Sequence, residues 1–542
     1  MPAAIRFSFI SLSLFAFLAV LGFAQTATTR PRFDVADIHR SALALNPYTY
    51  LSGGVLRGAR YDLRKATMLD LVRIAYGVDP EAVYGGPNWL AFDRFDIAAK
   101  APKLSSPETI RLMLQSLLSE RFKLAVHKDT RPMPAFVLAM GRGTPKLKKS
   151  EGPDNPGECQ YQPQPAPATF VVYSCRNIRM KTFAETLRGM AGDYLAEPVV
   201  DSTDLKGAWD FDLKWNARSQ ILPDGSPRTT IFDAVEKQLG LTLSLQKAPA
   251  AVLVIDHVNE QPTDNPPDAA QELPPRELQF EVASVRMSRP GEDGAFRVTP
   301  GGGLEAHGIT MRVLFATAWD VDWTHVEQRI VGLPKWADSA RFDIAAKAST
   351  ATNSPPVLGP GMPDDDVRLM LRSLLIDRFG IKSHYENRLV DAYTLVSRSP
   401  KLKKADPNNR AGCREAPTIA HDPRDINPRL SQLIQCQNTS MAQFAELLQG
   451  VAPDYFAYNV EDATGISGAW DFTLSFTPTW MLRAATPQIG LSPVASGSAV
   501  EPTGTISLPE AINKELGLKL EMQKRKVQVL VIDHINEKPA DN

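Results

Sequence analysis

The segment RFDIAAKA occupies residues 94–101 and returns without a change at residues 341–348. Four further matches follow in the same order along both parts of the chain. They are RLMLQSLL at 111–118 with RLMLRSLL at 368–375, PKLKK at 145–149 and 400–404, GAWDF at 207–211 and 468–472, and VLVIDHVNE at 252–260 with VLVIDHINE at 529–537. Because a series this long and ordered does not arise by chance, the chain contains two tandem copies of one domain.

The length of the chain agrees with this division, since 542 residues exceed the ~250–300 at which single hydrophobic cores stop growing. We place the first copy at residues 30–262 and the second at 278–542, joined by a Pro-rich linker at 263–277. Matching segments lie farther apart toward the end of the chain, which indicates insertions in the second copy. Their composition predicts that the insertions, near 350–363 and at 477–505, are loops.

Amphipathic helices are predicted where apolar residues recur at helical spacing. The spacing i, i+3, i+4, i+7, i+8 places five such residues on one face of a helix in each copy. These are Ile110, Met113, Leu114, Leu117 and Leu118 in the first copy, and Val367, Met370, Leu371, Leu374 and Leu375 in the second. Ser106 followed by Pro107 predicts the start of the first of these helices. Capping boxes predict three more helix starts, at Thr67 with Asp70, Thr182 with Glu185, and Ser507 with Glu510.

Short strands alternate with these helices, and most are bounded by Gly or Pro. In the first copy we predict strands at 33–39, 95–99, 122–127, 135–140, 170–174, 209–215, 241–246 and 251–256. A helix at 229–239 precedes the last two strands, which a Pro-containing turn separates. This order predicts an α+β domain of two subdomains, in which small mixed sheets carry helices packed on one face.

Composition and the N-terminus bear on compartment and partners. The formal net charge is −1 and the pI is about 6.7, so no overall field favours nucleic acid. Arg6 precedes an apolar run at 7–23, and residues 1–24 resemble a secretory signal with cleavage after Ala24; an uncleaved membrane anchor is the alternative. After residue 24 no apolar run approaches the ~18 residues that span a bilayer. We therefore expect a periplasmic or secreted protein without a membrane span.

Four cysteines follow the repeat, with Cys159 and Cys175 in the first copy and Cys413 and Cys436 in the second. In an exported chain, one even pair per copy predicts one disulfide per copy, although pairing across the copies is also open. A redox or metal site is the rival interpretation. It lacks a Cys-x-x-Cys motif and nearby His ligands.

No catalytic, cofactor-binding or metal-ligating set is predicted. Two His pairs recur between the copies, His127 with His384 and His257 with His534, and both are interpreted as strand-end residues. Asp256 and His257 are not a catalytic pair, because adjacent strand residues point to opposite faces. The chain also lacks nucleophile-elbow and phosphate-loop motifs.

Other recurring residues are interpreted as structural. Arg94 with Asp96, and Arg341 with Asp343, are expected to form structural ion pairs. The tryptophans that recur are expected to cover their own cores, and a solvated basic loop is expected at 146–149. The tryptophans are Trp89, Trp336, Trp209 and Trp470.

The motif series resembles the soil-associated protein family, an exported domain of unknown function that is expanded in acidobacteria and other soil bacteria. The motifs are AYGV at 75–78, GGPNW at 85–89, RFDIAAKA at 94–101, LLSERF at 117–122, PKL at 145–147, GAWDF at 207–211 and VLVIDH at 252–257. Domains of this family also occur fused to peptidases of the antibiotic-sensor type. The helix–strand–strand order at the end of each copy is similar, more distantly, to the short N-terminal domains of secretins and TonB-dependent receptors, which implies a role in protein interaction. The second copy departs from the pattern at 318–321 and at Gly380, where the first has Lys123.

These observations favour an exported, non-enzymatic module without a cofactor. We expect it to bind a protein, a peptide or a component of the cell envelope, for which exposed sheet edges offer a route by strand addition. One alternative is a hydrolase with an unfamiliar site, for which the candidates are Asp96, His127 and His257 with their repeat partners Asp343, His384 and His534. The other is a structural envelope protein without a ligand. The oligomeric state does not follow from the sequence.

Overall fold

The computed structural model describes residues 30–42, 51–151, 157–164, 170–218, 228–276, 278–289, 294–299, 302–322, 325–348, 365–406, 410–415, 432–485 and 504–541. The predicted signal segment, the predicted insertion at 350–363 and most of that at 477–505 lie outside these residues. Among the helices in this part of the chain, none is long and apolar enough to cross a membrane.

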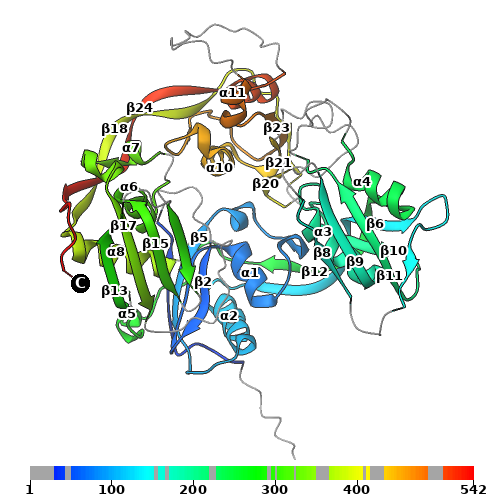
Figure 1. Cartoon of the computed structure of the whole chain (residues 1–542), viewed down its shortest axis with the longest axis horizontal. Coiled ribbons are helices and arrows are strands. Elements are labelled where there is room, and N and C mark those ends of the chain that lie inside the picture. The colour runs from blue at the N-terminus through cyan, green and yellow to red at the C-terminus, as the bar shows by residue number, and fades with distance from the viewer. Residues whose placement is uncertain are drawn as a thin grey trace, which may run out of the picture.

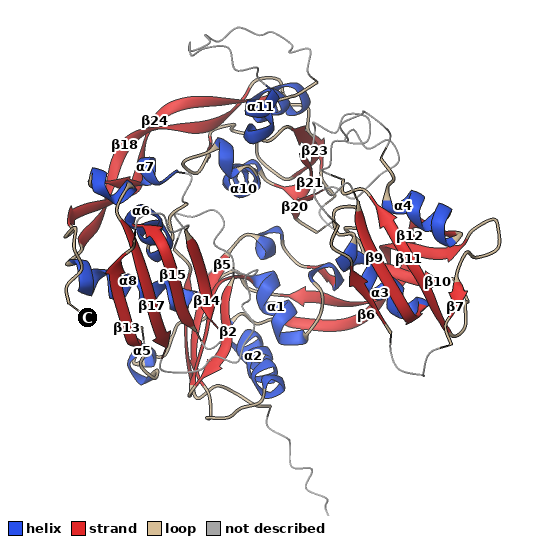
Figure 2. Cartoon of the chain, viewed as in Figure 1, coloured by secondary structure: helices blue, strands red, loops and turns tan. Residues whose placement is uncertain are grey.

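The predicted α+β class is confirmed, and the described residues of the first copy form three four-stranded sheets (Figure 2). Their strand orders are β1-β5-β3-β2, β10-β6-β12-β4 and β7-β11-β9-β8. The strands are β1 (Val35–Arg40), β2 (Ser52–Arg57), β3 (Arg60–Thr67), β4 (Val83–Gly85), β5 (Arg94–Lys100), β6 (Ala125–Met140), β7 (Lys148–Lys149), β8 (Glu158–Tyr161), β9 (Val171–Arg179), β10 (Val199–Ser202), β11 (Ala208–Trp215) and β12 (Leu241–His257). The helices are α1 (Met68–Tyr76), α2 (Pro107–Arg121), α3 (Met180–Met190), α4 (Ile231–Ala234) and α5 (Ala269–Glu272), with the short 3-10 helices η1 (Pro80–Ala82) and η2 (Asn88–Ala91) and the π-helix η3 (Val235–Leu239).

The second copy repeats this architecture in its described residues, with strand orders β13-β17-β15-β14, β16-β24-β18-β22 and β19-β23-β21-β20. Its strands are β13 (Phe280–Met287), β14 (Ala295–Thr299), β15 (Gly303–Thr310), β16 (Ile330–Val331), β17 (Arg341–Ala348), β18 (Lys382–Ser397), β19 (Lys403–Lys404), β20 (Gly412–Glu415), β21 (Gln432–Thr439), β22 (Glu461–Asp462), β23 (Trp470–Phe476) and β24 (Leu518–His534). Its helices are α6 (Met311–Ala318), α7 (Val326–Arg329), α8 (Asp365–Phe379), α10 (Met441–Val451), α11 (Thr479–Ala485) and α12 (Leu508–Ala511), with η5 (Lys335–Asp338), η6 (Pro453–Tyr455) and η7 (Ile512–Leu516). Helix α11 begins inside the segment that was predicted to be a loop.

Each copy has two hydrophobic cores, one against its first sheet and one against its last, counted over the described residues. The predicted apolar stripes of α2 and α8 are confirmed, because all ten of their residues are buried. These helices therefore cover the first sheet of each copy.

Most helix starts follow the predicted caps. Thr67 and Ser507 form capping boxes, and the Ser106 hydroxyl accepts a hydrogen bond from the Thr109 amide. The predicted start at Thr182 is wrong, because α3 already begins at Met180 and Thr182 lies inside its first turn. The strand before α3 leads directly into the helix, so Thr182 is not needed as a cap.

A long two-stranded ribbon joins the two cores of each copy. Strands β6 and β12 pair along their whole length, so the predicted break at 128–134 and the Pro-containing turn between 246 and 251 are wrong. Pro249 lies directly opposite Pro132 in this ribbon. Every second residue of an antiparallel pair directs its N–H away from the partner strand, so a proline there removes no ladder bond.

The two halves of a copy have the same topology. The first and last sheets share one strand order, and α1 follows β3 as α3 follows β9. The long strands are exchanged between the halves: β6 contributes Phe136 and Leu138 to the second core, and β12 contributes Leu253 and Ile255 to the first. The described chain is thus four variants of one half-repeat, and Figure 1 shows the long strands running between the packed parts.

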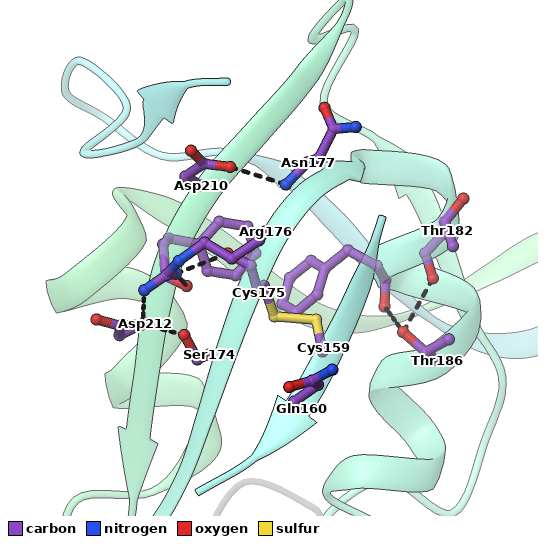
Figure 3. The surroundings of a disulfide bond; sticks show 12 residues. Cys159, Gln160, Ser174, Cys175, Arg176, Asn177, Thr182, Thr186, Asp210 and Asp212 are labelled. Atoms are coloured by element: carbon purple, nitrogen blue, oxygen red, sulfur yellow. Dashed lines mark hydrogen bonds and ion pairs between the residues drawn. A yellow bond between two sulfur atoms is a disulfide. The ribbon is translucent and has the colours of Figure 1, made fainter. Parts of the chain in front are cut away.

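A β-bulge precedes a helix in each half-repeat, and an aspartate holds it. Asp96 accepts from the Lys65 amide at 2.8 Å, and Asp343 accepts from the Gly308 amide at 3.0 Å. The last sheets repeat this arrangement with Asn177 to Asp210 at 2.7 Å, drawn in Figure 3, and Asn438 to Asp471 at 2.9 Å. All four amides belong to residues with positive φ. The carboxylate therefore supplies the acceptor that the irregular ladder lacks.

Charged side chains join the first sheet of the first copy to α8 and the end of α6. Lys65 lies 3.0 Å from Asp320, and the Ser52 hydroxyl donates to Asp365 at 2.8 Å. Asp366 contacts both Arg57 and Arg276. The chain between the copies is also held, because the Thr263 amide donates to the Arg121 carbonyl and α5 packs on β1.

Candidate functional site

Both disulfides predicted within the copies are present. Cys159 bonds to Cys175, and Cys413 bonds to Cys436. In each case the two residues lie directly opposite each other on neighbouring strands, β8 with β9 and β20 with β21. Figure 3 shows the first bridge beside the start of α3. Because Cys175 and Cys436 are fully buried in the second cores, the bridges are structural.

The recurring histidines acquire partners that sequence reasoning missed. His127 Nδ1 lies 2.9 Å from the Asp256 carboxylate, and His384 Nδ1 lies 2.9 Å from Asp533. All four side chains are about half exposed. His384 has a second carboxylate partner, Glu386. Among the described residues, the contacts of the His127 and His384 rings are with carboxylates, and no Ser, Thr or Cys side chain completes a catalytic triad with them. His257 and His534 instead contact Asn259 and Asn536.

The Arg and Asp of the RFD motif bind the bulge and not each other. Arg94 Nη1 donates to the Lys65 carbonyl at 2.7 Å, and Arg341 Nη1 donates to the Gly308 carbonyl at 2.6 Å. The predicted ion pairs within the motif are therefore wrong, because the bulged backbone lies nearer to both side chains. Asp96 and Asp343 have a structural role, and neither lies beside His127 or His384.

The remaining candidates are also structural. All four recurring tryptophans pack partly buried against the core of their own half-repeat. The predicted basic loop is instead partly regular, since Lys148 and Lys149 form the edge strand β7 against β11. Among the residues that the structure describes, no group of three or more His, Cys, Asp or Glu side chains could hold a metal ion.

No functional role was predicted from the sequence for the two-stranded ribbon of the second copy, which consists of β18 and β24. Beyond Thr394–Leu395, where β22 pairs with β18, no described strand covers the outer edge of β18. The Leu395 carbonyl accepts from the Ala463 amide on this outer side at 2.9 Å. By the alternation of an antiparallel pair, Tyr385, Asn387 and Leu389 direct their N–H and C=O groups to the same side.

Three successive residues whose backbone N–H and C=O groups face this edge have uncharged side chains. Leu389 is 66% exposed and Tyr385 is 42% exposed, and Asn387 lies between them. The other edge of the ribbon carries Lys524 and Lys526, and charged edge residues discourage pairing. The open edge ends at Tyr393, because Arg525 Nη1 donates to the carbonyls of Tyr393 and Asn459 and so occupies the Tyr393 carbonyl.

The first copy has proline at the position of Leu389, and Lys128 and Thr130 at the positions of Tyr385 and Asn387. Pro132 pairs with Pro249, and the equivalent pair in the second copy is Leu389 with Lys526. The Phe136 amide donates outward to the Pro198 carbonyl at 2.8 Å, so Pro132 and Pro134, at the same alternation, also face outward. Proline offers no N–H to an added strand, so the first copy interrupts this edge at Pro132 and Pro134, where the second copy has Leu389 and Asp391.

Comparison with known proteins identifies the family of the chain. The family described as protein of unknown function DUF3738 matches residues 69–258 and 312–535, which is more than half of the chain and one match in each copy. No curated protein and no solved structure matches the chain.

Proposed function

The chain belongs to the DUF3738 family of proteins of unknown function, and from this premise we propose that it is an exported binding module, which captures an extended peptide segment on the outer edge of β18. The observation that carries the proposal is the uncharged edge Tyr385–Asn387–Leu389, whose equivalent positions in the first copy are Lys128, which is charged, Thr130 and Pro132. Main-chain hydrogen bonds would supply affinity, and alternate side chains would supply specificity.

The partner suited to this edge is an unfolded or extended segment with apolar side chains at alternate positions. Such side chains would lie beside Leu389 and Tyr385, on the exposed face that also carries Met522, 55% exposed. The two disulfides support an oxidising compartment such as the periplasm or the cell exterior. The resemblance to the soil-associated family supports a partner from the cell envelope or surroundings of the cell.

The test uses the full chain and a phage-displayed library of random heptapeptides. Selected peptides are synthesised, their affinities are measured by calorimetry, and their contact site is mapped by amide hydrogen exchange. Binding should slow exchange at Asn387 and Leu389. Leu389→Pro, which copies Pro132, should weaken binding by at least tenfold, whereas Lys526→Pro, which copies Pro249 on the other edge, should leave it unchanged. Equal binding by Leu389→Pro, or protection elsewhere, would refute the proposal.

A second candidate function is hydrolysis, favoured by the repeated His–Asp contacts. It is tested by replacing His127 and His384 together with Gln and assaying a panel of ester, amide and glycoside substrates. Any hydrolysis by the unchanged protein that disappears in a folded double variant would favour an enzyme over a binding module.

A further inference from the structure

A cavity of about 750 Å³ lies in the first copy, between the β2–β3 hairpin and helices α1 and α2. Its volume falls within the ~300–1,000 Å³ that small-molecule sites span. Apolar side chains from three elements line it: Leu56 from the hairpin, Ile74 from α1, and Ile110 and Leu114 from α2. A chain or ring of hydrocarbon would be removed from water on entering this space.

Two cationic side chains, Lys103 and Arg111, also line the cavity. Lys103 is exposed and forms no ion pair among the described residues. Arg111 is 45% exposed and contacts Glu108 of its own helix, and Glu108 is not among the lining residues. The site therefore combines an apolar interior with a net positive charge, which complements an anion.

We propose that this cavity binds a single-chain anionic amphiphile, of which a fatty acid anion is the simplest example. Its hydrocarbon chain lies along Leu56, Ile74 and Ile110, and its head group lies near Lys103 and Arg111. This site is separate from the β18 edge and does not depend on peptide binding.

The equivalent face of the second copy differs in its charges and in its contacts. Arg368 stands at the position of Arg111, and it binds Asp320 at 2.9 Å and also contacts Asp365. Asp320 in turn contacts Lys65 of the first copy, so this face of the second copy is used in the contact between copies. Thr317 replaces Ile74 on the equivalent helix. The equivalent face of the first copy is left with its cavity.

The test is a fluorescence titration of the full chain with dansyl-labelled undecanoic acid, followed by competition with decanoate and with decanol. We expect saturable binding of one probe per chain, and displacement by decanoate at a concentration about tenfold lower than by decanol. Replacing Lys103 and Arg111 together with Gln should remove the advantage of the acid. Ile74→Trp, which fills the cavity, should abolish binding.

Thr317→Trp is the matched control, because it places the same bulk at the equivalent position of the second copy, and it should bind like the unchanged protein. Circular dichroism checks that each variant is folded. No saturable binding, or a folded Ile74→Trp that binds normally, would overturn the proposal. So would an acid advantage that survives in the double Gln variant, which is a surface change and does not depend on the tryptophan variant folding.

Discussion

At the scale of single residues, one aspartate in each half-repeat accepts a hydrogen bond from a backbone amide of the β-bulge. Asp343 is buried and accepts hydrogen bonds from the Gly308 amide and the Ser288 hydroxyl, at 3.0 and 2.6 Å. Burial pushes the pKa of this carboxyl upward, but these bonds and the guanidinium of Arg286 outweigh it, and the pKa lies below its usual value. The bulge before α6 is therefore held by a charged acceptor.

We predict that Asp343→Ala lowers the free energy of unfolding by about 1–3 kcal/mol at neutral pH, because a buried amide loses its acceptor. A depressed pKa stabilises the fold above the unfolded value and stops doing so as the pH falls through the folded value. The difference between the variant and the unchanged protein should therefore shrink in acid. Urea denaturation at several pH values measures it, and Asp391→Ala, an exposed change, is the control; an effect that grows in acid would contradict this account.

His384 should titrate above its ordinary pKa. Its hydrogen bond to Asp533 raises the pKa most among the favourable contributions, and Glu386 adds to it, although desolvation opposes both. A raised pKa means that the charged ring is favoured in the folded state at low pH, and that this contribution is lost as the pH rises through the folded value. Asp533→Asn should move the NMR titration midpoint down, toward 6.5. An unchanged midpoint would show that the contact does not persist in solution.

Recurrence between the copies identified side chains that form specific contacts in the structure, but it could not predict their contact partners. Asp96 and Asp343 were recognised as structural, yet their acceptor role depends on a bulge 31 residues away from Asp96 in the sequence. Asp256 lies 129 residues after His127 and meets it only because β6 and β12 pair. Contacts of this kind follow from register, which no local pattern encodes.

At the scale of elements, the ribbons show how position within a strand decides what a proline does. The first copy places Pro132, Pro134 and Pro249 in the ribbon and keeps its pairing intact. Strand prediction failed here because proline is usually a sign of a turn. Helices such as α2 were predicted well, since their apolar spacing and caps are local properties of the sequence.

Proline substitution in β18 should therefore be tolerated at alternate positions. Leu389→Pro changes an outward N–H and should leave thermal stability close to that of the unchanged protein. Val390→Pro removes an inward ladder bond to β24 and should lower the free energy of unfolding by about 1–3 kcal/mol. Differential scanning calorimetry compares the two, and a larger loss in Leu389→Pro would show that the register is shifted by one residue.

At the scale of the whole molecule, a charged cluster holds the copies together. Asp366 of α8 is 13% exposed and contacts Arg57 and Arg276 of the chain before it. Burial first, and then the charge of the neighbouring Arg64, lower the pKa of Arg276 to about 10. Two arginines that share one carboxylate depend strongly on it, because an unpaired buried charge is costly.

Removing this carboxylate should loosen the contact between copies. In Asp366→Ala the two arginines would regain their hydration only if the copies separate, so the radius of gyration from small-angle X-ray scattering should increase. Asp377→Ala, on the same helix but 80% exposed, should leave the radius unchanged. An unchanged radius in both variants would show that other contacts suffice, such as that of Arg414 with Glu197 at 3.4 Å.

The exchange of long strands within each copy bears on the ancestry of the chain. A polypeptide of half this unit would have its own helices and outer sheet, but the strand that completes its core would come from elsewhere. Two identical molecules could satisfy each other by trading that strand, as swapped homodimers do. Gene fusion of such a pair, followed by one duplication, would yield a four-part chain of this kind. Proline at the crossing of one ribbon and leucine with lysine at the other then record divergence after the duplication.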